Sequence, residues 1–116
     1  MRYLCVYKPG TETQAPPSQR ELAEMGKLID DMTRAGVLLG TGSCQPSTNS
    51  VRLDVNAGRV EARSATFDPT QHVGGYCMMQ VKSKAEAIEW GKRFLTIVGR
   101  GSSELFELTE FTPPAA

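Results

Sequence analysis

The spacing of hydrophobic residues changes along the chain, and in two segments it has the period of an amphipathic helix. Both segments open with a serine three residues ahead of a glutamate, Ser18 with Glu21 and Ser83 with Glu86. This spacing is the capping-box signature, in which the serine hydroxyl accepts a hydrogen bond from the first turn of the helix. The sequence therefore predicts two amphipathic helices, the first of which ends near Gly36.

Other segments alternate between apolar and polar residues, or are rich in aromatic and β-branched ones, and both patterns predict strands. The clearest case is a hairpin across residues 51–63 with a turn at Asn56-Ala57-Gly58, whose alternation predicts one apolar and one polar face. Further strands are predicted at residues 2–7, 37–39, 73–81 and 104–111. The segments 40–50 and 64–72 have neither period and are predicted to be loops.

The predicted order is strand, helix, strand, hairpin, strand, helix, strand. Two strand-helix-strand units joined by a hairpin match the ferredoxin-like α+β arrangement, in which both helices cover one face of an antiparallel sheet. The opposite face would then expose more apolar area than a soluble monomer usually tolerates. We therefore expect a two-fold homodimer in which a second copy covers that face. Residues 1–112 form the single predicted domain, and residues 113–116 a frayed tail.

The composition narrows the classes of partner. The chain has 116 residues, enough for one domain but not for a second core. Its 13 lysines and arginines are balanced by 13 aspartates and glutamates, so the basic excess typical of nucleic-acid-binding proteins is absent. No apolar run approaches the roughly 20 residues that span a bilayer, and residues 1–10 lack the features of a signal peptide. We therefore expect neither a nucleic-acid nor a membrane partner.

Three cysteines, Cys5, Cys44 and Cys77, are widely separated and show neither the CxxC nor another metal-binding spacing. Reduced thiols are the simplest interpretation, and we expect a cytoplasmic location. Because the chain has only one histidine, no metal site is predicted. Residues 40–43 are glycine-rich, but no Gly-Lys-Ser/Thr follows them, so neither a nucleotide site nor a cofactor is predicted.

The only histidine, His72, stands four residues after Asp68 at the end of the second predicted loop. A histidine with a carboxylate partner can act as a general base near neutral pH, and loops at strand ends often carry binding residues. We take these two as the candidate catalytic residues. The alternative is that both are ordinary solvated loop residues without mutual contact.

Three further residues are candidates for ligand binding. Arg63 lies on the predicted hairpin with Arg52, and the two could clamp a carboxylate or phosphate, although alternating charges are more often the solvated face of a hairpin. Tyr76 lies in a predicted strand, where it lines a pocket or belongs to the core or a dimer interface. Cys44 lies in a Gly/Ser-rich loop without a basic neighbour to lower its thiol pKa, so an inert thiol is the alternative to a reactive one.

Four segments together carry a family resemblance. They are residues 1–6, 32–40, the Val-Gly-Gly-Tyr run at 73–76, and the Val-Lys-Ser-Lys-Ala-Glu-Ala-Ile-Glu-Trp run at 81–90. The chain resembles the YCII-related proteins over nearly its whole length, and the nearest branch is the one named for an Asp-Gly-Pro-Phe (DGPF) motif. The resemblance implies a ferredoxin-like fold assembled as a dimeric α/β barrel, with a pocket between the sheet and the segments around the hairpin.

The chain departs from this branch at the motif itself. Counting back from Gly74-Gly75-Tyr76, the motif positions are occupied by Arg63-Ser64-Ala65-Thr66. Phe67-Asp68-Pro69 is a possible displaced version of the motif, which would put Asp68 in the role of the motif acid. The ancestral acid is therefore either lost or replaced by Asp68.

The resemblance does not imply one reaction, because most members of this branch have no established activity. Some are encoded beside extracytoplasmic-function sigma factors, and a few distant relatives act as small-molecule lyases or dehydrochlorinases. The first hypothesis is a pocket protein that binds a small organic anion, or a cofactor-free acid–base enzyme of the lyase or isomerase type. The alternative is a non-catalytic accessory or regulatory partner of a protein such as a sigma factor. A cofactor-free monooxygenase is a third option by fold analogy alone.

Overall fold

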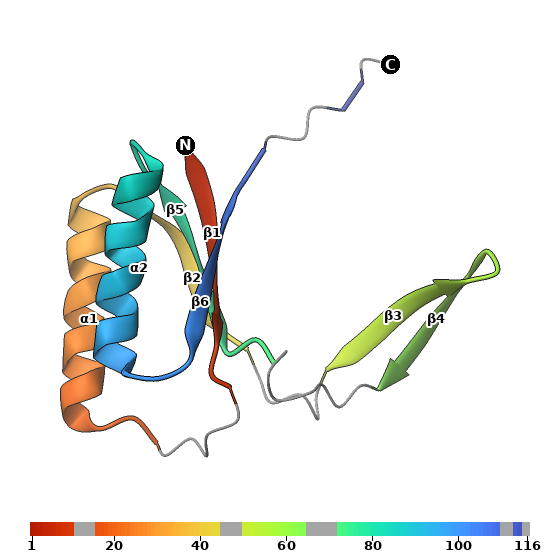
Figure 1. The fold of residues 1–116 in the computed structure, drawn as a ribbon, viewed down its shortest axis with the longest axis horizontal. Coiled ribbons are helices and arrows are strands. Elements are labelled where there is room, and N and C mark those ends of the chain that lie inside the picture. Colours follow the sequence, from red (N-terminus) through yellow and green to blue (C-terminus); the bar gives the residue numbers. More distant parts are fainter. Residues whose placement is uncertain (11–15, 45–49, 65–71, 110–112, 115–116) are drawn as a thin grey trace.

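The computed structural model describes residues 1–10, 16–44, 50–64, 72–109 and 113–114, and Figure 1 shows how their helices and strands are arranged. The elements are β1 (Arg2–Lys8), α1 (Gln19–Arg34), β2 (Leu38–Ser43), β3 (Val51–Asn56), β4 (Arg59–Ser64), β5 (Gly75–Gln80), α2 (Lys84–Val98) and β6 (Ser102–Glu107). The predicted order is confirmed. So is the α+β class, since an antiparallel sheet with two helices is consistent with a ferredoxin-like fold.

Four strands form an antiparallel sheet in the order β2-β5-β1-β6, and both helices cover one face of it (Figure 1). Alternation along β1 assigns its side chains to the two faces. Tyr3 pairs with Met79 of β5, and Cys5 pairs with Cys77, on the inner face that the helices cover. The residues between them point to the outer face.

Both helices begin at the serines that the capping boxes indicated. Ser18 Oγ accepts a hydrogen bond from the backbone N–H of Glu21, and Ser83 Oγ accepts one from the N–H of Glu86, each at 3.1 Å. The second helix ends at Gly99, whose left-handed φ of 74° lets its N–H bond back to the last turn. The chain then returns to the sheet as β6.

The core lies between the helices and the inner face of the sheet. Among the described residues, the buried hydrophobic side chains form one cluster, made up of Tyr3, Cys5, Leu28, Met32, Val37, Met79, Val81 and Ala87. Met79 and Ala87 are its most deeply buried members, at 1% and 0% exposure. Packing of the two amphipathic helices on one sheet face therefore supplies most of the hydrophobic stabilisation.

The two helices are also joined by an ion pair. Arg93 Nη2 of α2 donates to Asp31 Oδ2 of α1 at 2.6 Å, and the same guanidinium lies 5.9 Å from the centre of the Trp90 ring. The hydrogen bond from Arg93 lowers the pKa of the Asp31 carboxyl below its usual value. The pair therefore ties helix packing to the ionised form of Asp31.

Arg93→Gln is expected to lower stability near neutral pH and to lose this effect in acid. Because the folded-state pKa of Asp31 is depressed, the pair contributes stability above the unfolded pKa of about 3.9, and this contribution disappears as pH falls through the lower folded value. Urea unfolding of the wild type and the variant should differ at about pH 7 and converge as the pH falls through the lowered pKa of Asp31. Lys92→Gln, an exposed neighbour on the same helix, is the control. A difference that stays constant with pH would contradict this role.

The second strand is longer than the sequence predicted, because residues 40–43 pair with β5 where the start of a loop was expected. Leu39 interrupts the pairing as a bulge between Leu38 and Gly40. Gly42 is needed here, since a Cβ at this position would lie 2.9 Å from Cε1 of the Tyr76 ring. The glycine therefore serves the close approach of a neighbouring strand and not a turn.

The hairpin of β3 and β4 is a separate two-stranded sheet that projects from the body on the side opposite the helices (Figure 1). We call it the arm (residues 51–64). Leu53 pairs with Ala62, and Val55 pairs with Val60, so these apolar residues share one face while charged residues share the other. The predicted division into an apolar and a polar face is confirmed.

Candidate functional site

A cavity of about 400 Å³ lies between the two helices and the inner face of the sheet. Protein interiors contain few voids larger than a water molecule, whereas pockets for small molecules measure roughly 300–1,000 Å³. This cavity therefore has the size of a ligand site and not of a packing defect.

The walls of the cavity are mostly apolar and come from both helices and from β1, β2 and β5. The first helix contributes Met25 and Met32, and the second contributes Trp90 and Phe94. From β1, Tyr7 meets Phe94 edge to face, with ring centroids 5.2 Å apart and an interplanar angle of 79°. Aromatic rings and flexible methionines suit a planar, mainly apolar molecule.

Two glycines let three strands come together at one end of the cavity. A Cβ at Gly74 would lie 3.1 Å from Cδ of Pro9 and 3.2 Å from Cδ2 of Tyr7. A Cβ at Gly75 would lie 3.0 Å from the backbone oxygen of Gly42. The Gly-Gly-Tyr run therefore has a structural reason, because side chains at these positions would force β1 and β2 away from β5.

One ion pair lies in the cavity wall, between Glu21 in the first turn of α1 and Arg100 in the turn after α2. Glu21 Oε1 and Arg100 Nη1 are 3.6 Å apart, and the two side chains are only 19% and 26% exposed. The Tyr7 hydroxyl donates a hydrogen bond to the Arg100 carbonyl at 3.1 Å, which ties this turn to β1. A negative and a positive charge are thus held together at the edge of an apolar space.

Arg100 also has a donor that none of the described residues satisfies. Its Nη1 donates to the carbonyl of Val98 at 3.3 Å, but its Nε is buried and has no hydrogen-bond partner among the residues that the structure describes. Buried donors are normally paired, and a bound acceptor oxygen would satisfy this one only if the Arg100 side chain shifted towards the cavity. Within the described cavity wall, Arg100 is therefore suited to anchor an acidic or carbonyl group.

Two cysteines, Cys5 and Cys77, stand opposite each other on β1 and β5 in the cavity wall. Burial raises the pKa of both thiols, that of Cys77 to about 11. Both are therefore neutral at pH 7, and a neutral thiol is a poor nucleophile. These cysteines serve as small core residues.

The structure does not show the two predicted catalytic residues, His72 and Asp68, together. Asp68 lies outside the described residues. His72 is partly exposed and stands two residues before Gly74, but it is not one of the residues that line the cavity. The acid–base role of these two residues stays a prediction.

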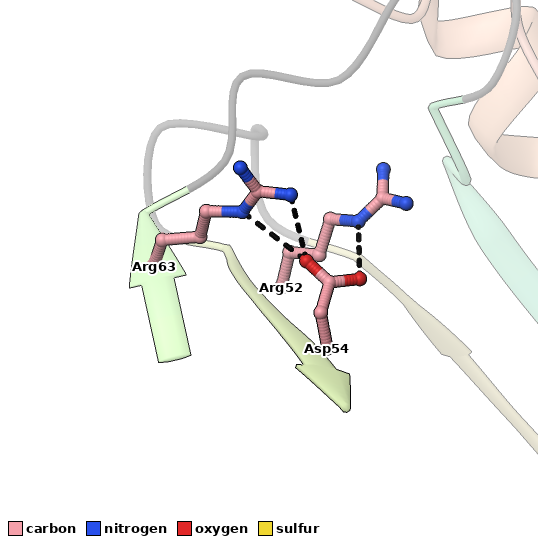
Figure 2. A network of polar contacts seen from close by, with 3 residues as sticks. All are labelled: Arg52, Asp54 and Arg63. Carbon is pink, nitrogen blue, oxygen red and sulfur yellow. Dashed lines mark hydrogen bonds and ion pairs between the residues drawn. The ribbon is translucent and has the colours of Figure 1, made fainter. Parts of the chain in front are cut away.

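The three predicted ligand-binding residues lie in different places. Tyr76 borders the cavity, but it pairs with Val6 and its ring therefore points to the outer face of the sheet. Cys44 is exposed just after β2 and is not in the cavity wall. Arg63 lies on the polar face of the arm, where Figure 2 shows it and Arg52 on either side of Asp54. Arg63 Nη2 and Nε donate to Asp54 Oδ2 at 2.7 and 3.2 Å. Hydrogen bonds from Arg52 and Arg63 lower the pKa of the Asp54 carboxyl, as expected for a solvated charged face.

Sequence reasoning missed Glu21 and Arg100. The capping box accounted for Glu21, and a carboxylate in that role is not expected to serve a pocket as well. The signal for Arg100 was its position between Gly99 and Gly101, since both glycines have positive φ and together define a tight turn from helix to strand. Such a turn fixes the position of the Arg100 Cα, and therefore the direction in which its long side chain extends into the fold.

Among the described residues, no group of three or more His, Cys, Asp or Glu side chains is placed to hold a metal ion. Within the same part of the chain, no helix is long and apolar enough to cross a membrane.

Comparison with known proteins gives a family match and a similar fold. The family model described as YCII-related domain matches residues 1–112. No curated protein matches the chain significantly. A similar solved structure is 5-chloro-2-hydroxyhydroquinone dehydrochlorinase (TftG) from Burkholderia phenoliruptrix AC1100, in complex with 2,5-dihydroxybenzoquinone. The two share 14% sequence identity with a TM-score of 0.51, and the match covers 96% of each chain. At this identity the likeness supports the fold alone.

Proposed function

The chain belongs to the YCII-related domain family, and from this premise we propose that it binds a small organic molecule between its helices and its sheet and acts on it by proton transfer. The observation that carries the proposal is the cavity of about 400 Å³, in which apolar walls surround the Glu21–Arg100 pair. A mainly apolar pocket with a few convergent polar groups is typical of small-molecule sites.

We infer that the ligand is a flat, mainly apolar ring compound with one acidic or carbonyl group. The rings of Tyr7, Trp90 and Phe94 offer faces and edges for contact with such a ring. Arg100 lines the cavity and offers a guanidinium charge for the oxygen. TftG, which has a similar fold, holds 2,5-dihydroxybenzoquinone, a small ring with oxygen substituents. That complex supports the idea that this fold accommodates such compounds.

Glu21 is the group we propose for proton transfer. Its carboxylate lies in the cavity wall, 3.6 Å from Arg100 Nη1. It can accept a proton from a bound molecule at Oε1 and return it to another atom, as isomerisations and eliminations require. Arg100 keeps a fixed positive charge beside any negative charge that develops on the bound molecule.

Ligand binding can be measured by the fluorescence of Trp90, because it is the only tryptophan in the chain and it lines the cavity. We expect benzoate-class carboxylates to alter its fluorescence at lower concentration than the matched benzamides do. Arg100→Gln should weaken carboxylate binding about 10-fold or more, because a charge-assisted hydrogen bond is lost. Benzamide binding should change little. Arg63→Gln is the matched control, since it removes an arginine from the arm.

Proton transfer is tested separately with ring ketones, whose C–H bonds next to the carbonyl are acidic, by following their deuterium uptake in D₂O by NMR. Glu21→Gln should slow the protein-dependent exchange about 10²–10⁴-fold while fluorescence shows that binding persists. His72→Ala tests the predicted acid–base residue in the same assay. If no ring compound alters Trp90 fluorescence, the binding proposal fails. If exchange depends on His72 and not on Glu21, the acid–base role passes to His72.

A second function, as a regulatory partner of another protein such as a sigma factor, is favoured by one observation. The arm exposes Val51, Leu53, Val55 and Val60, and exposed apolar patches often mark protein contacts. In that case arm variants would abolish partner binding, and Arg100→Gln would leave it intact.

Two finer assignments accompany the main proposal. We propose that the chain belongs to the Asp-Gly-Pro-Phe branch as a member without the motif, since Arg63-Ser64-Ala65-Thr66 occupies its positions. We also propose a cytoplasmic location. Its support is that Cys5 and Cys77 are free thiols although they stand opposite each other, and free thiols are typical of a reducing compartment.

A further inference from the structure

The cavity between the helices and the sheet has a charged end. Glu21 and Arg100 stand there, where α1 begins beside the end of α2 (Figure 1). Tyr7 and Gly75 belong to the same end, because they pair across β1 and β5 and the Tyr7 hydroxyl bonds to the Arg100 carbonyl. The side chains of Glu21 and Arg100 are 19% and 26% exposed, so solvent reaches this end.

The opposite end of the cavity is closed by buried apolar side chains. Met32 comes from the last turn of α1, and Leu38 at the start of β2 pairs with Met79 of β5. Met32 and Met79 are only 5% and 1% exposed. From Gly75 to Met79 the strand advances about 13 Å, at 3.3 Å per residue. The cavity is therefore elongated, with one charged and one closed end.

One face of α1 forms the long wall between these ends. Four of its residues line the cavity at intervals of four, four and three positions, namely Glu21, Met25, Ile29 and Met32. Residues at this spacing lie on one side of a helix, and the first and last are about 16 Å apart at 1.5 Å per residue. Thr41, a polar residue of the facing wall, already donates its hydroxyl to a backbone carbonyl of β5. Beyond Glu21 this wall is therefore mainly apolar.

The aromatic side chains of the wall stand between the two ends. Tyr7 meets Phe94 edge to face near the charged end. Trp90 lies one turn of α2 further from Arg100 than Phe94 does, beside the apolar half. From the charged end to the closed end, the wall thus changes from charged, through aromatic, to mainly aliphatic.

We propose that the ligand is an aromatic acid with an unbranched alkyl tail, whose acid group lies at Arg100 and whose tail runs along α1 towards Met32. This rests on the proposed function and narrows the class of ring compound that the site takes. A ligand with acid, ring and tail in this order matches the order of the wall. Flexible methionines such as Met25 and Met32 suit a flexible tail.

The size of the cavity also requires more than a simple ring acid. Benzoate has nine non-hydrogen atoms, which at roughly 30 Å³ each, the share of a water molecule in the liquid, fill at most about 270 Å³. The cavity measures about 400 Å³, so benzoate would leave its closed end empty. Wall atoms that face empty space lose their contacts, and a tail that fills the space restores them.

A series of para-alkylbenzoates, from methyl to decyl, tests the tail by titration of Trp90 fluorescence below the concentration at which the compounds form micelles. Each added CH₂ should lower the Kd by up to about 4-fold, the factor for full burial of one CH₂. The gain should stop at the tail length that reaches Met32 and Met79, and longer tails should bind more weakly. Arg100→Gln should weaken every member by a similar factor, because acid group and tail contact opposite ends.

Two substitutions in the apolar half should change the best tail length in opposite directions. Leu38→Ala enlarges the closed end and should favour a tail longer by at least one carbon. Ile29→Phe fills space along α1 and should favour a shorter tail, and since Ile29 is 39% exposed, the larger ring can be accommodated. Leu53→Ala is the matched control, because Leu53 lies on the arm and not in the cavity wall. Circular dichroism and thermal melting check folding.

The outcomes separate this inference from the proposed function. If benzoate binds but the Kd does not depend on tail length, or the best length stays the same in both cavity variants, the alkyl tail is wrong and the binding site stands. If Leu53→Ala removes the gain from the tail, the alkyl groups bind to the arm, which also overturns the inference. If no member of the series alters Trp90 fluorescence, both proposals fail.

Discussion

Met79→Ala is expected to lower the free energy of unfolding by about 2–5 kcal/mol, the usual cost of truncating a buried methionine. Met79 is 1% exposed and lies on β5 opposite Tyr3, in the middle of the core. It also lines the cavity, so the truncation adds empty volume to about 400 Å³ that is already present. Surrounding side chains that already border open space gain few new contacts by moving inward. Urea unfolding followed by circular dichroism measures the loss.

Met78→Ala is the matched control, because Met78 is the next residue on β5 and points to the outer face opposite Leu4. It should lose clearly less stability than Met79→Ala. Equal losses would contradict the assignment of the two faces. Met79→Ala should also favour bulkier ring compounds in the Trp90 fluorescence assay, since the atoms it removes come from the cavity wall.

Gly101→Ala is expected to destabilise the protein by about 2–4 kcal/mol, through a strained backbone and a steric clash together. Gly101 has a φ of 80°, which L-residues rarely adopt. A Cβ there would lie 2.5 Å from the Lys8 carbonyl oxygen and 3.0 Å from the Tyr7 hydroxyl, so either β1 or the turn must move. Because Tyr7 bonds to Arg100 in the same turn, we also expect weaker binding of carboxylates in the fluorescence assay.

Gly99→Ala separates the two causes, because Gly99 has a similar φ of 74° but open space around the position of a Cβ. Its free energy of unfolding should fall only by the cost of the left-handed backbone, about 1–2 kcal/mol. The difference between the two variants, measured as unfolding free energies in urea, then reports the clash with β1. Equal losses would show that the contact with Lys8 is readily relieved.

The elements of the fold could be predicted where the signal is local. The capping serines Ser18 and Ser83 mark the helix starts, because a cap is formed by residues three apart. The two faces of the arm follow from alternation within one short segment. The prediction failed at Gly42, where the glycine accommodates the ring of Tyr76 from another strand. A contact between distant segments cannot be read from either segment alone.

The candidate site was harder to predict than the fold. Glu21 and Arg100 are far apart in the sequence and meet because α1 begins beside the end of α2. The cavity itself leaves no pattern in the sequence, since it depends on how far the helices stand from the sheet. Tyr76 borders the cavity, but the register of β5 puts its ring on the outer sheet face over Gly42, so its role in ligand binding stays a prediction. The polar contacts of Arg63 with Asp54 agree with the solvated face that was its alternative interpretation.

The walls of the cavity are also the core of the domain, and Cys5, Leu28, Met32 and Met79 belong to both. A substitution that reshapes the site for another molecule therefore changes stability at the same time, and marginally stable domains tolerate few such changes. Divergence towards new ligands should then proceed by paired substitutions, one on a helix and one on the facing strand. Ligand preference and folding would evolve together in this lineage, with each limiting how fast the other can change.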